Sequence, residues 1–179
     1  MNARPVPGSS PCLPTSATTL YGELPVPVPH TAPELATLLH LLADHRRPRL
    51  CGVAIGHSRD DASRAAAVAF ADAWRARGNT VLAVVDWPEQ AASWLRPARR
   101  LTAGEPDALV VAAAPLGWVQ LARRLRHSTL WRPDRTFGFA SLAEPVAAAL
   151  AGPGVLDGVR GAGADGGVWR IERGWTTSA

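Results

Sequence analysis

The 179-residue sequence predicts an α/β fold, a three-layer sandwich around a four-stranded, mainly parallel sheet in the order 2-1-3-4, with a C-terminal hairpin. Two observations support this prediction. Four nearly continuous apolar runs recur along the chain, as expected of strands buried on both faces. Segments with apolar residues at helical spacing lie between them, joined by short loops, and this alternation favours parallel strands with helices on both faces.

The first 30 residues differ from the rest of the chain. Seven prolines fall within residues 1–30, too many for regular structure, so we expect an extended tail or a strap lying on the domain. Residues 31–179 are predicted to form a single α/β domain. Its first helix starts with Thr31 as N-cap, Pro33 in the first turn and Glu34 at the capping-box position.

Strands and helices then alternate in a Rossmann-like manner. The strand-like runs are "LCGVAI" (50–55), "TVLAVVD" (80–86), "DALVVAA" (107–113) and "TFGFA" (136–140), and the helices between and after them cover about 59–77, 88–101, 116–127 and 142–151. Pro97 is expected to shorten or kink the helix at 88–101. The last segment, "VLDGVRGAGADGGVWRIERG", holds two short apolar runs around Gly-rich turns and predicts a hairpin at the sheet edge.

Charge and composition exclude several classes of site. All 19 basic residues are arginines, so Schiff-base lysines and Walker-type phosphate lysines are excluded. The arginines are spread over the expected helix surfaces and helix ends, which disfavours nucleic-acid binding. Cys12 and Cys51 are too few and too separate for a disulfide framework or a zinc site, and we expect no metal and no cofactor.

The chain shows no sign of a membrane span or an export signal. No apolar run approaches the roughly 20 residues that span a bilayer, and the N-terminus lacks an apolar signal core. We therefore expect a cytoplasmic protein or a fragment. The Ala, Arg, Pro and Gly bias is typical of high-GC coding of the actinobacterial type.

Two predicted loops flank the candidate site. In such folds, ligands bind beyond the carboxyl ends of the strands, where the strand order reverses. The loops at residues 56–59 and 114–117 meet at this crevice. Ser58 is expected to cap the following helix and to leave backbone N–H groups free for a small anion or carboxylate. His57 is either a ligand contact or an incidental polar residue, and Trp118 is placed to wall the pocket or an interface.

The same loop carries no complete catalytic motif. "GHSRD" is not a G-x-S-x-G nucleophile elbow, and Gly52 and Gly56 do not form G-x-G-x-x-G. His57 is the acid/base candidate if the chain is an enzyme. Asp60 and Asp61 are favoured in the first turn of a helix whether or not a ligand exists.

Four runs carry a resemblance to a known family: "CGVAIGHSRDDASRAAAVAFADAWRARGNTVLAVV", "EPDALVVAAAPLGWVQLARRLR", "LWRPDRTFGFASLAEP" and "LDGVRGAGADGGVWRIERG". From about residue 31 to 173, the chain resembles the second lobe of type 1 periplasmic-binding-fold proteins, the substrate-binding receptors of branched-chain amino-acid ABC transporters. The resemblance implies that three loops face a ligand. They carry His57 and Ser58, Pro115 and Trp118, and Ala140 and Ser141.

The departures from this family also have implications. The family closes two lobes on a ligand, whereas here a Pro-rich tail stands where the first lobe would be. A lone lobe exposes the face that the other lobe would cover, and such surfaces are commonly used for pairing, so the resemblance implies a homodimer or a partner chain.

We therefore consider three hypotheses. The first is a non-catalytic small-ligand-binding or regulatory module that takes a small polar or anionic ligand, or a partner protein. Its ligand-binding residues are His57, Ser58, Pro115, Trp118 and Ser141. The second is a small α/β enzyme, a hydrolase or lyase of a specialised bacterial pathway, with His57 as acid/base. The third is a scaffold with a vestigial pocket.

Overall fold

The computed structural model describes residues 24–44 and 52–178, which form an α/β domain around one mixed sheet. The strands are β1 (Val53–Ser58), β2 (Val81–Trp87), β3 (Ala108–Ala112), β4 (Thr136–Gly138), β5 (Arg160–Ala162), β6 (Val168–Glu172) and β7 (Trp175–Ser178). Their order is β2-β1-β3-β4-β5-β6-β7. Strands β1 to β5 run parallel to one another, β6 is antiparallel to β5, and β7 is antiparallel to β6. The α/β class and the order of the first four strands are confirmed, but the prediction of a four-stranded sheet is wrong.

The predicted sheet is too small because the last strands are short and lack the long apolar runs on which the prediction depended. Strand β5 is only Arg-Gly-Ala and pairs in parallel with β4. Gly161 is required there, since a Cβ would collide with the Gly138 carbonyl oxygen and the Trp169 ring. The expected hairpin is present as β5 and β6, and a second tight turn at Arg173 and Gly174, both with positive φ, leads into β7.

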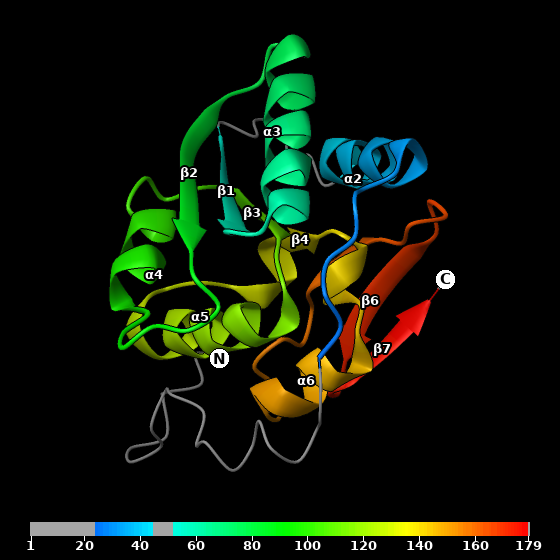
Figure 1. Ribbon diagram of the computed structural model, residues 1–179. Coiled ribbons are helices and arrows are strands. Elements are labelled where there is room, and N and C mark those ends of the chain that lie inside the picture. Colours follow the sequence, from blue (N-terminus) through cyan, green and yellow to red (C-terminus); the bar gives the residue numbers. More distant parts are fainter. Residues whose placement is uncertain (1–23, 45–51, 179) are drawn as a thin grey trace.

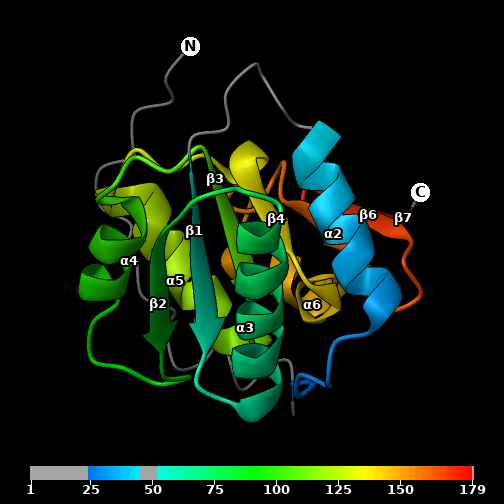
Figure 2. The same ribbon diagram turned by 90° about the horizontal axis from the view of Figure 1, so that it is seen from above.

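Helices cover both faces of the sheet, as the prediction of three layers requires. They are α2 (Ala32–Asp44), α3 (Asp61–Ala76), α4 (Leu95–Thr102), α5 (Pro115–Ser128) and α6 (Pro145–Ala151), with short 3-10 turns η1 (Pro133–Arg135) and η2 (Ala140–Leu142). Helices α2 and α3 lie on one face, and α4, α5 and α6 lie on the other (Figures 1 and 2).

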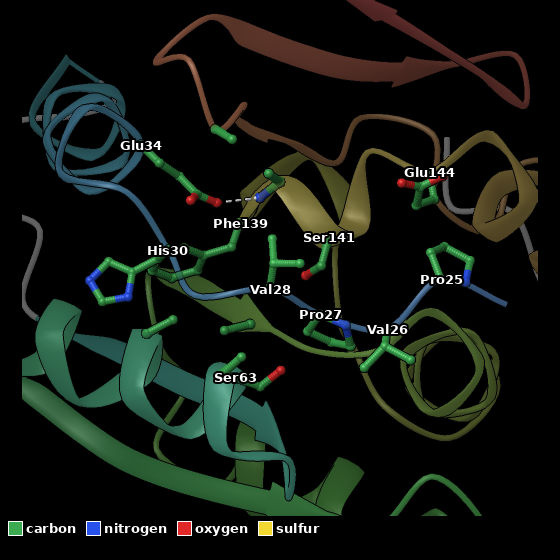
Figure 3. A pocket seen from close by; sticks show the side chains of 15 residues that line it. Pro25, Val26, Pro27, Val28, His30, Glu34, Ser63, Phe139, Ser141 and Glu144 are labelled. Atoms are coloured by element: carbon green, nitrogen blue, oxygen red, sulfur yellow. Dashed lines mark hydrogen bonds between the residues drawn. The ribbon is translucent and has the colours of Figure 1, made fainter.

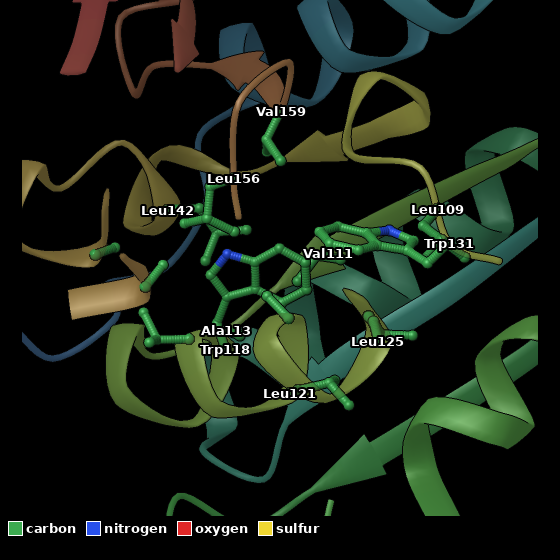
Figure 4. Packing of buried hydrophobic residues seen from close by; sticks show 14 of the residues in the cluster. Leu109, Val111, Ala113, Trp118, Leu121, Leu125, Trp131, Leu142, Leu156 and Val159 are labelled. Carbon is green, nitrogen blue, oxygen red and sulfur yellow. The ribbon is translucent and has the colours of Figure 1, made fainter. Parts of the chain in front are cut away.

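Two hydrophobic clusters hold these layers to the sheet. On the α2/α3 face, Phe70 stacks on Trp74 with ring centroids 5.7 Å apart. On the other face, Trp118 packs edge-on against Trp131 at 6.1 Å, among leucines and valines of α5 and the sheet (Figure 4). Burial of these aromatic rings removes a large apolar area from water and stabilises each face.

The helix boundaries follow the local sequence. Helix α4 starts at Leu95 rather than at Pro88, which places Pro97 in its first turn, where the missing N–H removes no helical hydrogen bond. The capping box of α2 is confirmed. The Glu34 N–H donates to Thr31 Oγ1 at 3.2 Å, and the Thr31 N–H donates to Glu34 Oε2 at 3.1 Å.

Residues 24–30 precede α2 and have no regular structure. They run from the region of α6 past the ends of the central strands to the start of α2 (Figure 1). Cys12 and Cys51 lie outside the described residues. Within residues 24–44 and 52–178, no helix has the length and apolar character needed to cross a membrane.

Candidate functional site

Ser58, at the end of β1, joins the loops that follow β1 and β3. Its hydroxyl donates to Asp60 Oδ2 at 2.6 Å and accepts from the Ala114 N–H at 2.9 Å, and it lies 3.1 Å from Ser63 Oγ. The residue is fully buried. The two loops therefore meet as predicted, but a hydroxyl has one donor and two acceptor positions, and the protein itself uses them here.

Asp60, not Ser58, caps α3. The Ser63 N–H donates to Asp60 Oδ1 at 2.8 Å, and Asp60 has the extended backbone of an N-cap residue. The expected cap at Ser58 is wrong because the helix begins only at Asp61. Burial raises the pKa of Asp60, but hydrogen bonds from Ser58 and Ser63 outweigh it and leave that pKa lowered. The carboxylate thus already occupies the positive end of the helix, which disfavours an anion there.

The His57 ring is held by the backbone rather than aimed at a cavity. Its Nδ1 lies 2.8 Å from the Ser58 carbonyl oxygen, and since a carbonyl only accepts, Nδ1 carries the proton. The ring is buried and lines neither hollow described below.

Pro115 and Trp118 lie at the start of α5 and are both buried. The Trp118 side chain is part of the core cluster and is fully covered (Figure 4). The N-terminus of α5 is closed by Glu89, whose Oε2 accepts from the Gly117 N–H at 2.8 Å. Burial is the main cause that raises the pKa of Glu89. Neither Pro115 nor Trp118 therefore presents a surface to a ligand.

A hollow of about 270 Å³ lies at the carboxyl ends of β3 and β4, between residues 25–30 and the starts of α3 and α6. Its lining comprises Pro25, Val26, Pro27, Val28, His30, Glu34, Ala62, Ser63, Ala66, Ala112, Phe139, Ala140, Ser141, Glu144 and Ala164 (Figure 3). Of the five residues predicted to bind a ligand, Ser141 lines this hollow. The other four, His57, Ser58, Pro115 and Trp118, do not.

One side of the hollow is fixed by Glu34. Its side chain is buried, and Oε1 accepts from the Ala140 N–H at 2.5 Å while Oε2 completes the capping box (Figure 3). This carboxylate thus ties α2 to the turn after β4, 106 positions away in sequence. Next to it, the His30 ring packs edge-on against Phe139 with centroids 6.0 Å apart. These contacts position the wall and leave Glu34 little capacity for a ligand.

Glu144 supplies a second carboxylate with different properties. It is the N-cap residue of α6, yet its side chain makes no capping hydrogen bond. Among the described residues, no hydrogen-bond or ion-pair partner of its carboxylate is found. Glu144 is half-buried, so its oxygens remain available to a bound molecule.

The sequence prediction missed most of this lining. Residues 25–28 come from the segment expected to be an extended tail or a strap lying on the domain, and their alternating Val-Pro pattern indicates only an extended chain. Glu144 directly precedes Pro145, a helix-start signal that marks it as a loop-end residue without revealing a pocket. Within the described part of the chain, no group of three or more His, Cys, Asp or Glu side chains is placed to hold a metal ion.

No protein-family model matches the sequence, and no curated protein matches it. Solved structures do match the fold. A putative branched-chain amino acid ABC transporter from Rhodospirillum rubrum has a TM-score of 0.61 and 22% identity, over 73% of this chain and 36% of that protein. A substrate-binding periplasmic protein from Ralstonia solanacearum gives 0.59 and 15%, over 75% and 37%, and an extracellular ligand-binding receptor from Verminephrobacter eiseniae gives 0.58 and 14%, over 73% and 37%.

The expected resemblance to type 1 periplasmic-binding-fold proteins is thus confirmed at the level of the fold. The chain spans little more than a third of the length of these three proteins.

Proposed function

We propose that the protein is a ligand-binding module that holds a small molecule in the hollow between residues 25–28, Ser141 and Glu144. The observation that supports this most is the combination of an apolar wall with a carboxylate that no described residue engages. A half-buried carboxylate attracts a cationic group more strongly than a fully exposed one, because water screens it less.

The chemistry of the hollow favours a small aliphatic molecule that carries an ammonium group. Val26, Val28 and Phe139 offer apolar contacts, Glu144 offers a charge partner, and Ser141 offers a hydroxyl. The volume of about 270 Å³ is near the lower end of small-molecule sites, which run from roughly 300 Å³ upward. Two acidic residues line the hollow, so it suits an anionic ligand, the class expected at Ser58, less well.

An aliphatic α-amino acid satisfies these requirements. The descriptions of the matched structures as branched-chain amino acid transport proteins and ligand-binding receptors agree with this ligand class. The alternative with His57 as acid/base is less favoured, since the His57 ring lines neither hollow and donates to its own neighbour's carbonyl.

Calorimetric titration of the full chain tests the proposal with three matched probes. They are L-leucine, isopentylamine, which lacks the carboxylate, and 4-methylpentanoate, which lacks the ammonium group. The proposal expects L-leucine and isopentylamine to bind and 4-methylpentanoate to bind much more weakly. If none of the three binds, the proposal fails and the vestigial-pocket hypothesis is favoured.

Glu144→Gln identifies the site of binding. Loss of a charge-assisted contact of about 1.5–3 kcal/mol weakens binding by about tenfold to a hundredfold. Glu105→Gln is the matched control, because Glu105 is an exposed carboxylate outside the hollow. Equal affinity in both variants would contradict a role for Glu144.

A further inference from the structure

A second hollow, of about 240 Å³, lies between the carboxyl end of β2 and helix α4. It shares no lining residue with the first hollow. Its polar lining consists of Arg59, Asp86, Ser93, Arg96 and Arg100, and Trp87 supplies an aromatic wall.

The charges around this hollow do not balance. Arg59 Nε donates to Asp86 Oδ2 at 2.6 Å, so one guanidinium and one carboxylate offset each other. The hydrogen bond from Arg59 is the main cause that lowers the pKa of Asp86 and keeps it ionised. Arg96 and Arg100 have no carboxylate within ion-pair distance among the residues that the structure describes. The hollow therefore carries an excess of two positive charges.

The dipole of α4 favours Arg100 in the last turn but disfavours a cation in the first turn, where Arg96 lies. Arg96 and Arg100 are four positions apart on the same helix, a spacing at which like charges repel and destabilise the helix. The helix contains no acidic residue, whereas Ala98 and Leu101 on its buried side are fully covered. An anion between the two guanidinium groups would remove the repulsion.

The indole of Trp87 is a buried part of the wall of this hollow. Its Nε1–H finds no acceptor within residues 24–44 and 52–178. Trp118 Nε1, buried in the core, likewise has no acceptor among the described residues, so this donor alone does not indicate a bound ligand.

We propose that this hollow is a second binding site, for a small anion with two or more anionic oxygen atoms, as found in phosphates and dicarboxylates. Planar guanidinium groups pair with such oxygens through two parallel hydrogen bonds. The Asp86 carboxylate excludes ligands that would place a negative group against it, so the anion lies towards α4.

The test is calorimetric titration of the full chain, at low ionic strength, with inorganic phosphate and separately with succinate. Saturable binding of phosphate alone assigns the site to phosphate groups, and binding of succinate alone assigns it to dicarboxylates; either supports the proposal. Absence of saturable binding of both at millimolar concentrations overturns it.

The double variant Arg96→Gln/Arg100→Gln locates the binding. The double variant should lower the affinity for the anion at least tenfold. Arg99 is exposed on the same helix and does not line the hollow, so Arg99→Gln should leave this affinity unchanged. Equal affinity in the double variant and the Arg99→Gln control overturns the proposal.

The double variant should also melt at or above the temperature of the unaltered chain without anion, since the repulsion between the two arginines is removed. L-leucine binding should persist in the double variant, so failure of the anion site and failure of the leucine site are distinguishable.

Discussion

The loop junction at Ser58 and the hollow beside Glu144 lie at the same ends of the sheet but use their polar groups differently. At the junction, the Ser58 hydroxyl donates to the Asp60 carboxylate and accepts from the Ala114 N–H, and the Ser63 N–H also donates to Asp60. At the hollow, no described residue hydrogen-bonds to the side chains of Ser141 or Glu144. Polar residues after a strand therefore identify a ligand site only where they keep spare hydrogen-bonding capacity beside an open volume.

The largest expected effect is a loss of folding stability at Trp118, which was predicted to line the ligand site but lies in the core. Trp118→Ala should lower the free energy of unfolding by about 3–5 kcal/mol, because it removes a fully buried ring. Urea denaturation measures this, with Trp175→Ala as control, since Trp175 is 73% exposed and should change stability by about 0.5 kcal/mol or less. Similar stability in both variants would show that Trp118 is not part of the packed core.

The junction itself is tested by Ser58→Ala. This change leaves the Ala114 N–H without its acceptor and removes a hydrogen bond to Asp60. The free energy of unfolding should therefore fall by about 1–3 kcal/mol. L-leucine affinity at a temperature where the variant is folded should stay near that of the unaltered chain. A large loss of affinity with unchanged stability would instead place Ser58 in the binding site.

Ser141→Ala should give the opposite pattern. Stability should change by about 0.5 kcal/mol or less, since no described residue hydrogen-bonds to this hydroxyl. Affinity for L-leucine should fall by a net hydrogen-bond contribution of about 0.5–1.5 kcal/mol. Calorimetry and urea denaturation of the same preparation separate the two quantities, and an unaltered affinity would remove Ser141 from the site.

The smallest effect concerns the closed N-terminus of α5. Burial raises the pKa of Glu89 in the folded chain above its ordinary value of 4.5, so the folded state holds this proton more tightly than the unfolded state. The stability that comes from this tighter proton binding at Glu89 is therefore complete below pH 4.5 and is lost as the pH rises through the folded-state pKa. Glu89→Gln should become progressively more stable relative to the unaltered chain over that range, as measured by thermal melts. A difference that does not vary with pH would contradict this.

Much of the fold could be predicted because it depends on local patterns. The runs that became β1, β3 and β4 are nearly continuous in apolar residues, and Thr31 and Glu34 form the capping box that their spacing indicates. Strand β5 could not be found this way, because the pairing of Arg160–Ala162 depends on a glycine that lets the chain approach β4.

The site was harder to predict than the fold. Ser58 and Asp60 are both good N-cap residues, and only the helix start at Asp61 decides between them. Trp118 was predicted to line the pocket, although its helical spacing to Leu121 and Leu125 is typical of a core-facing residue. The proline-rich pattern of residues 25–28 allows a strap on the domain, but no local pattern shows which hollow such a strap lines.

The measurement that tests the account most directly is a crystal structure of the protein grown with L-leucine. We predict the amino acid in the hollow under residues 25–28, with its ammonium group at Glu144 and its side chain against Val28 and Phe139. A leucine bound beside Ser58 and His57 instead, or crystals saturated with L-leucine that show none in this hollow, would contradict the proposed site.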